Sequence, residues 1–119
     1  MRKWRTTCAL AAAVVLCSAG ANAAIYTGAM VFQGVEKYTK DIANPTKRDI
    51  GPGAAMMMGY IFGVADADQG VCPDPRLSAA NFMVVVDSYL KLHQDQLDKN
   101  AAVLVSAALR EAYPCHRNK

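Results

Sequence analysis

The chain has 119 residues, 53% of them hydrophobic, and a formal net charge of +3 at pH 7. This length allows one domain. Three of the 13 Lys and Arg residues lie within the first five positions, in a segment that we expect to be cleaved, and the remainder carries ten basic and ten acidic residues. A domain without net charge gives no support to nucleic-acid binding, which requires an excess of basic side chains.

The first 23 residues have the features of a secretory signal peptide. Basic residues are followed by an apolar run over residues 6–19 and by the small-x-small sequence Ala21-Asn22-Ala23. The run is too short to span a bilayer comfortably. We therefore expect cleavage before Ala24, export to the periplasm, a mature domain over residues 24–119, and no membrane association after cleavage.

The first predicted helix covers residues 29–40. Its inward face has apolar residues at three- and four-residue steps, namely Met30, Val31, Val35 and Tyr38. Gly34 interrupts this helix and is expected to weaken it by roughly 1 kcal/mol relative to Ala. A loop over residues 41–53 follows, because the segment contains Asn-Pro and Gly-Pro-Gly turn signals.

The second predicted helix, residues 54–67, is apolar nearly all round, which predicts a central helix buried on all sides. Gly59 and Gly63 are spaced so that they would let another helix approach closely. Three consecutive methionines begin at Met56. They could form an adaptable binding surface, but core filling is the favoured interpretation.

A polar turn stiffened by Pro73 and Pro75 follows this helix. Asp66-x-Asp68-x-Gly70 resembles the start of a calcium-binding loop. However, Leu77 stands where that loop needs a bidentate Glu, so we expect no metal site. The polar side chains of the turn are predicted to be solvent-exposed, and they are Asp66, Asp68, Gln69, Asp74 and Arg76.

Ser78 is predicted to cap a third helix that runs to about His93. Its inward face consists of Phe82, Val85, Val86, Tyr89 and Leu92. Asp95 is predicted to cap a fourth helix, which Pro114 ends. The buried face of that helix consists of Leu97, Ala101, Leu104, Val105, Ala108 and Ala112. No segment shows a convincing strand alternation, so the predicted fold is an all-α bundle of about four helices.

Two of the four cysteines lie in the expected signal peptide, which leaves Cys72 and Cys115 in the domain. An even number of cysteines in an exported chain predicts a disulfide. This bond would close a loop of about 44 residues and stabilise the domain by on the order of 4 kcal/mol in the chain-entropy model. A redox or metal pair fits less well, because there is no Cys-x-x-Cys sequence and His116 is a lone neighbour.

The domain offers few candidates for catalysis. Ser78 is better explained as a helix cap, and both cysteines are expected to be oxidised. His93 near Asp95 could form a catalytic pair, but the helix dipole explains a histidine at a helix C-terminus better. No two acids stand out as an acid/base couple. We therefore expect no catalytic residue, no cofactor, no metal and no enzymatic activity.

Four stretches of the chain, taken in order, resemble one known family. They are Gly59-Tyr60-Ile61-x-Gly63-Val64-x-Asp66, Cys72-x-Pro, Tyr89-Leu90-x-x-His93, and Ala107-Ala108-Leu109-x-Glu111-Ala112-Tyr113-Pro114-Cys115. Over residues 58–115 the chain resembles the Rap/Tai family, the immunity proteins of type VI secretion amidase effectors. The resemblance implies an all-helical periplasmic protein, usually a homodimer, that binds a peptidoglycan-cleaving amidase and blocks its active-site cleft. It also supports the Cys72–Cys115 disulfide.

Two departures from the family pattern have structural consequences. Family members commonly carry a second cysteine pair, at the positions of Gly34 or Val35 and of Met57 in this chain. The first helix is therefore expected to be held less tightly. The His-Pro sequence of the family is His93-Gln94 here, so we expect a softer break between the third and fourth helices.

An immunity protein of this kind is expected to contact the amidase through the Asp66–Arg76 turn and the Leu92–Asp98 connection, because loops protrude from a bundle. The residues predicted to bind the partner are Asp66, Asp68, Gln69, Asp74, Arg76, His93 and Asp95. The alternative function is a general periplasmic protein-binding module, similar to small acid-stress chaperones, that exposes apolar surface at low pH.

Overall fold

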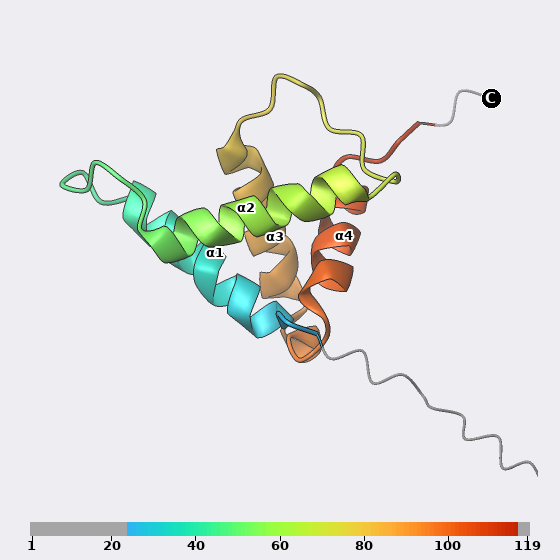
Figure 1. The fold of residues 1–119 in the computed structure, drawn as a ribbon, viewed down its shortest axis with the longest axis horizontal. Coiled ribbons are helices and arrows are strands. Elements are labelled where there is room, and N and C mark those ends of the chain that lie inside the picture. The colour runs from blue at the N-terminus through green and yellow to red at the C-terminus, as the bar shows by residue number, and fades with distance from the viewer. Residues whose placement is uncertain (1–23, 117–119) are drawn as a thin grey trace, which may run out of the picture.

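The computed structural model describes residues 24–116, so the expected signal peptide lies outside the described residues. The elements are α1 (Gly28–Ile42), α2 (Pro52–Ala67), α3 (Ala79–Leu92), the short 3-10 helix η1 (Gln94–Gln96) and α4 (Ala101–Ala112). Extended pairing in this range is limited to two isolated bridges. The predicted all-α bundle is therefore confirmed, with α2 lying across α3 (Figure 1).

Sequence signals account for most helix boundaries. Pro52 is the first residue of α2, where its missing N–H removes no helical hydrogen bond. Ser78 precedes α3, and Asn81 Oδ1 accepts a hydrogen bond from the Ser78 backbone N–H at 2.8 Å. The predicted cap of the fourth helix, Asp95, is wrong, because the chain forms η1 there. Asn100 caps α4 instead, by accepting a hydrogen bond from the Ala102 N–H at 2.9 Å.

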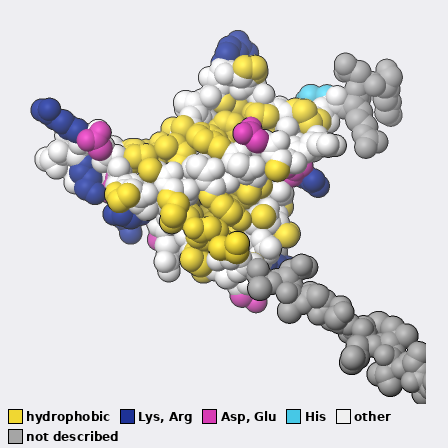
Figure 2. All heavy atoms as spheres, viewed as in Figure 1, with side chains coloured by type: hydrophobic (Ala, Val, Ile, Leu, Met, Phe, Trp, Pro, Cys, Tyr) yellow, Lys and Arg dark blue, Asp and Glu magenta, His cyan; other side chains and the backbone are white. Residues whose placement is uncertain are grey.

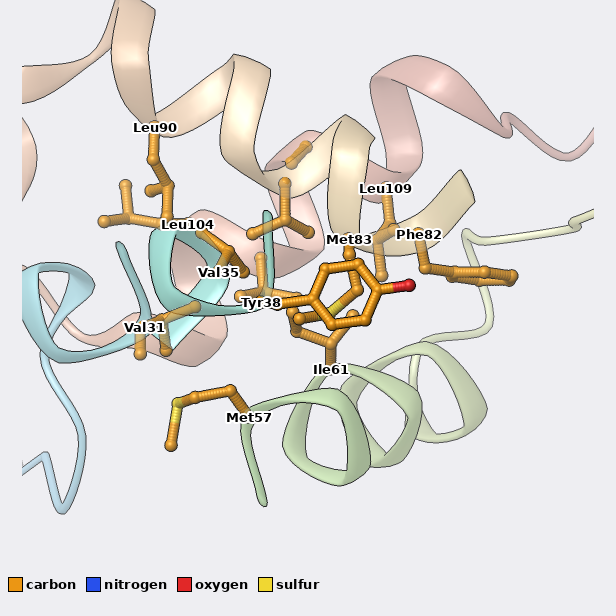
Figure 3. Close-up of a cluster of buried hydrophobic side chains, with 14 of the residues drawn as sticks. Val31, Val35, Tyr38, Met57, Ile61, Phe82, Met83, Leu90, Leu104 and Leu109 are labelled. Atoms are coloured by element: carbon orange, nitrogen blue, oxygen red, sulfur yellow. The ribbon is translucent and has the colours of Figure 1, made fainter. Parts of the chain in front are cut away.

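One hydrophobic core lies between all four helices, and side chains from each helix converge in it (Figure 3). Its largest fully buried side chains are Val31, Val35, Ile61, Met83, Val86, Leu90, Val105 and Leu109. α1 packs most extensively against α2 and α3, and α3 against α4. The apolar periodicity of α1, α3 and α4 therefore places their inward faces largely as predicted.

α2 is buried on one side only, which contradicts the prediction of a central helix. Ala54, Met57 and Ile61 face the core. Met56 is 54% exposed, and a side chain added at Gly59 or Gly63 would meet no atom within 4 Å. The close helix approach predicted at these two glycines is therefore wrong within the described residues. Figure 2 shows hydrophobic side chains over this outer face, with Lys and Arg gathered at its margins.

Gly34 of α1 lies directly against Met57 of α2. A Cβ at residue 34 would lie 2.0 Å from Met57 Cγ and 2.9 Å from Met57 Cβ. The missing side chain therefore creates the space that Met57 fills. These are the positions at which the family resemblance places a second cysteine pair, and the structure brings them into contact.

Asp41 anchors the loop between α1 and α2. Its side chain is 5% exposed and accepts hydrogen bonds from the Lys47 ammonium and, at 3.2 Å, from the Gly51 backbone N–H. These donors, Lys47 foremost, hold the pKa of Asp41 below its usual value. The predicted surface loop is therefore fixed at one buried carboxylate, while residues 43–49 are exposed.

Candidate partner-binding surface

The loop between α2 and α3, residues 68–78, arches away from the helices (Figure 1). The first half of the loop is bonded to residues 113–115, which follow α4. The Cys72–Cys115 disulfide joins them with the two Cα atoms 4.9 Å apart, which confirms the predicted bond. Beside it, the Cys72 N–H donates to the Tyr113 carbonyl at 2.8 Å. The loop is therefore held at its base by covalent and hydrogen bonds.

An internal ion pair fastens the start of the same loop. Arg110 Nε and Nη2 of α4 each donate to Asp68 Oδ1, at 2.9 and 2.8 Å, and the Gly70 N–H donates to the same oxygen at 2.8 Å. The hydrogen bond with Arg110 is the largest cause that lowers the pKa of Asp68 to about 2. The predicted solvent exposure of Asp68 is therefore wrong, because its side chain is 5% exposed and its carboxylate is bonded to Arg110 within the protein.

The tip of the loop carries a second, exposed pair. Asp74 accepts hydrogen bonds from the Arg76 backbone N–H at 2.9 Å and from its guanidinium at 2.6 Å. The Arg76 guanidinium holds the pKa of Asp74 below its usual value. The Arg76 side chain is 90% exposed, so it projects its charge into solvent from a loop that Asp74 has ordered.

Aromatic packing supports the loop from below. Phe82 of α3 lies edge-on to Phe62 of α2, with ring centroids 5.4 Å apart, and the ring of Tyr113 lies at the same distance on a tilt. Val71 of the loop is buried and belongs to the same hydrophobic core. Aromatic pairs of this geometry add roughly 0.5–1.5 kcal/mol each beyond area burial. These pairs therefore stabilise the end of the bundle from which the loop leaves.

The corner between α3 and α4, residues 93–100, lies at the other end of α3. His93 Nδ1 lies 2.7 Å from the Tyr89 carbonyl, and the two rings stack with centroids 3.9 Å apart. The Gly28 N–H donates to the Lys99 carbonyl at 2.9 Å, and the Ala101 N–H donates to the Tyr26 carbonyl at 3.0 Å. The start of the described chain thus holds the corner in place.

The structure separates the predicted partner-binding residues into two groups. Asp66 is exposed in the last turn of α2, and Asp68, Gln69, Asp74 and Arg76 follow in the loop. His93 is half-buried at the corner, and Asp95 is exposed in η1. The 14 residues of α3 separate the groups, a length of roughly 20 Å. They form two patches, not one.

Sequence reasoning missed a groove between α3 and α4. Its volume is about 290 Å³. It is lined by Val84, Val85, Ser88, Tyr89, Leu92, His93, Ala108, Glu111 and Ala112. The helical periodicity assigned Leu92 and Ala112 to the core, but Leu92 is 81% exposed and Ala112 is exposed as well. Only the resemblance pointed to this region, because its motifs include His93 and Glu111.

The chemistry that these surfaces support is binding. Within residues 24–116, no group of three or more His, Cys, Asp or Glu side chains is arranged to hold a metal ion. None of the helices in the described part of the chain has the length and apolar character needed to cross a membrane. Exposed charges on an ordered loop, and an apolar groove between two helices, are both features of protein-recognition surfaces.

Comparison with known proteins gives one match. A family model described as Rap1a immunity proteins matches residues 12–115, which is most of the chain. The match covers the loop, the corner, the groove and both bonded cysteines. No curated protein matches the chain.

Proposed function

This chain belongs to the Rap1a family of immunity proteins, and we propose that it acts in the periplasm against a peptidoglycan amidase delivered by a type VI secretion system. An immunity protein protects a cell by binding a toxin. The family match over residues 12–115 is the observation that supports this proposal most directly. The expected signal peptide supports a periplasmic location, because it would export the domain to the compartment that holds peptidoglycan.

Inhibition on this proposal is steric. The loop 68–78 and the corner 93–100 would contact the amidase around its active-site cleft. Both are fastened before binding, the loop by the Cys72–Cys115 disulfide and the corner by backbone hydrogen bonds to the start of α1. A fastened surface loses little conformational freedom on association, which favours tight binding. The chain would therefore act as a plug and not as an enzyme.

Within the predicted loop residues, the structure favours Arg76 and Asp66 as contacts over Asp68. Arg76 is 90% exposed on its side chain, while the Asp68 side chain is 5% exposed and paired with Arg110. We therefore expect Arg76→Glu to weaken amidase binding. Arg48→Glu, in the exposed loop between α1 and α2, is the matched control. Equal affinities of the two variants would count against the loop 68–78.

The proposal includes a homodimer formed through the outer face of α2. No charged residue occurs between Asp49 and Asp66. Met30 and Met56 are among the exposed large hydrophobic side chains. A two-fold interface places one surface against itself, so an uncharged face avoids like-charge repulsion.

Light scattering after size-exclusion chromatography tests the proposed dimer, and a wild-type mass equal to one chain would refute it. Met56→Lys should yield a monomer, whereas Val103→Lys on α4 should not.

The central test uses the oxidised protein, expressed with its own leader and purified from the periplasm. It serves as bait for the periplasmic and secreted fraction of the producing bacterium, and bound proteins are identified by mass spectrometry. The proposal expects one dominant amidase whose cleavage of purified peptidoglycan stops at one equivalent of this protein. Undiminished cleavage at saturation would refute it. Many partners whose binding rises at low pH would favour the chaperone-like alternative.

A further inference from the structure

The groove between α3 and α4 has an apolar floor and an apolar rim. Ala108 of α4 is buried in its floor, and Val85 and Tyr89 of α3 are half-buried along its side. At the rim, Val84 is 55% exposed and Leu92 is 81% exposed. The eight-residue interval between them corresponds to roughly 12 Å of helix, or about two turns. The groove therefore offers a continuous apolar contact about as long as a short peptide segment.

Polar groups at the groove have hydrogen-bonding capacity that the described part of the chain does not fill. Ser88 and Glu111 line it, and neither side chain makes a hydrogen bond or ion pair with residues 24–116. His93 uses Nδ1 at the Tyr89 carbonyl, which leaves Nε2 available. Each of these groups can therefore serve a partner without breaking an internal contact.

The charge at the groove has one sign. Among the described residues that line it, Glu111 is the only acidic or basic one apart from His93, and none is Lys or Arg. The nearest cations along the two helices are committed elsewhere, because Lys91 pairs with Asp87 and Arg110 pairs with Asp68. A carboxylate beside an apolar groove, with no cation of its own, is complementary to a Lys or Arg that accompanies an apolar side chain.

We infer that this groove binds a segment of the toxin that presents an aliphatic or aromatic side chain next to a Lys or Arg. The inference rests on the proposed function and adds an anchoring site that the loop and the corner do not provide. A second copy of this chain is a poorer occupant, because a two-fold contact would bring another Glu111 to a groove in which no Lys or Arg of residues 24–116 takes part. The apolar side chain enters between Val84 and Leu92, and the cation pairs with Glu111.

The first test uses defined peptides and needs no toxin. The probes are acetyl-Gly-Lys-Leu-Phe-Lys-Gly-amide and the same peptide with Glu in place of Lys. Each is titrated into the oxidised, isotope-labelled protein, and amide chemical shifts are followed by NMR. The cationic peptide should shift groove amides and bind more tightly than the acidic one, by at least the roughly 1.5- to fivefold that one exposed ion pair gives.

Variants separate the two parts of the inference. Glu111→Gln should reduce the ratio of the two affinities to about one, whereas Asp49→Asn, in the exposed loop between α1 and α2, should leave it unchanged. Val84→Asn removes the apolar contact without adding charge, and it should weaken both peptides by about tenfold or more, as the loss of an apolar anchor does. Val103→Asn is its matched control, because Val103 is 60% exposed on α4 outside the groove.

Circular dichroism shows whether each variant is folded, and Glu111→Gln still decides the charge step if Val84→Asn is not. The inference is overturned by shifts that map elsewhere, by equal binding of both peptides to the wild type, or by an unchanged ratio in Glu111→Gln. With the captured amidase, Val84→Asn should lose affinity and Val103→Asn should keep it. Equal loss or equal retention refutes the groove but not immunity, whereas the absence of any neutralised amidase refutes the proposed function itself.

Discussion

Replacing Gly34 by Ala should destabilise the protein, although helix propensity alone predicts the opposite. In a helix interior, Ala is more favourable than Gly by roughly 1 kcal/mol. In this structure, however, the new Cβ would lie 2.0 Å from Met57 Cγ and 2.9 Å from Met57 Cβ. Rotation of the Met57 side chain can move Cγ, but it leaves Cβ in place, so α1 and α2 must separate slightly.

The two effects can be weighed against each other. Overpacking a well-filled core costs about 1–3 kcal/mol, and the propensity gain offsets roughly 1 kcal/mol of this. Because Met57 is only 4% exposed and its Cβ is fixed, we place the overpacking cost in the upper half of its range. The expected net loss is therefore about 1–2 kcal/mol, or a fall in Tm of roughly 4–15 °C for a domain of this size.

Urea denaturation of the oxidised protein, carrying Met56→Lys so that the proposed dimer does not contribute, measures this loss when followed by circular dichroism. Gly59→Ala is the matched control, since the added Cβ meets nothing within 4 Å on the outer face of α2. It should stabilise by about 0.4–1 kcal/mol. Adding Met57→Ala to Gly34→Ala should cost less than the sum of the single changes, because the new methyl group partly fills the vacated space. A Gly34→Ala protein as stable as Gly59→Ala would refute the reasoning.

Three further predictions concern the bonds that fasten the loop and the helices. Cys72→Ser should lower the free energy of unfolding by on the order of 4 kcal/mol, measured in urea, and an unchanged midpoint would contradict it. The pKa of Asp68 is lowered to about 2 in the folded state, mainly by Arg110, so its stabilising effect is complete above about pH 4 and is lost as the pH falls toward 2. In Asp68→Asn, the free energy of unfolding should therefore vary less with pH between about 4 and 2 than it does in the wild type. An equal pH dependence in the two proteins would argue against this. Gly34→Cys combined with Met57→Cys should form a second disulfide on oxidation, seen as a mass loss of about two hydrogens, because the two positions touch.

The sequence predicted the fold well where each helix has one apolar face. In α3, Phe82 and Val86 repeat at helical spacing, and both are buried. The prediction for α2 was wrong for a physical reason. A helix that is apolar all round has no polar stripe, so its sequence does not say which side is outside. The start of the fourth helix could not be predicted for a similar reason. Asp95 and Asn100 are both good capping residues, and the choice of Asn100 depends on backbone hydrogen bonds from residues near the start of α1.

The sequence predicted which segments are exposed, but it did not predict how their side chains are arranged into a surface. Pro73, Pro75 and the flanking charges indicated an exposed turn, and the structure places an exposed loop there. The pairing of Asp68 with Arg110 joins residues 42 positions apart. Local patterns cannot reveal a contact of that range. The groove depends in the same way on how α3 and α4 pack, so Glu111 gave no signal on its own.

The disulfide divides the chain into a covalent ring and an open arm. The ring runs from Cys72 to Cys115 and encloses α3 and α4, while α1 and α2 lie before it and are held against it by packing and by backbone hydrogen bonds between residues 26–29 and 97–101. Opening the arm would not break the ring, so the two parts need not unfold in one step. Hydrogen exchange should then be faster in the amides of α1 than in those of α3. An immunity protein built this way could loosen one half while the loop 68–78 stays bonded at Cys72.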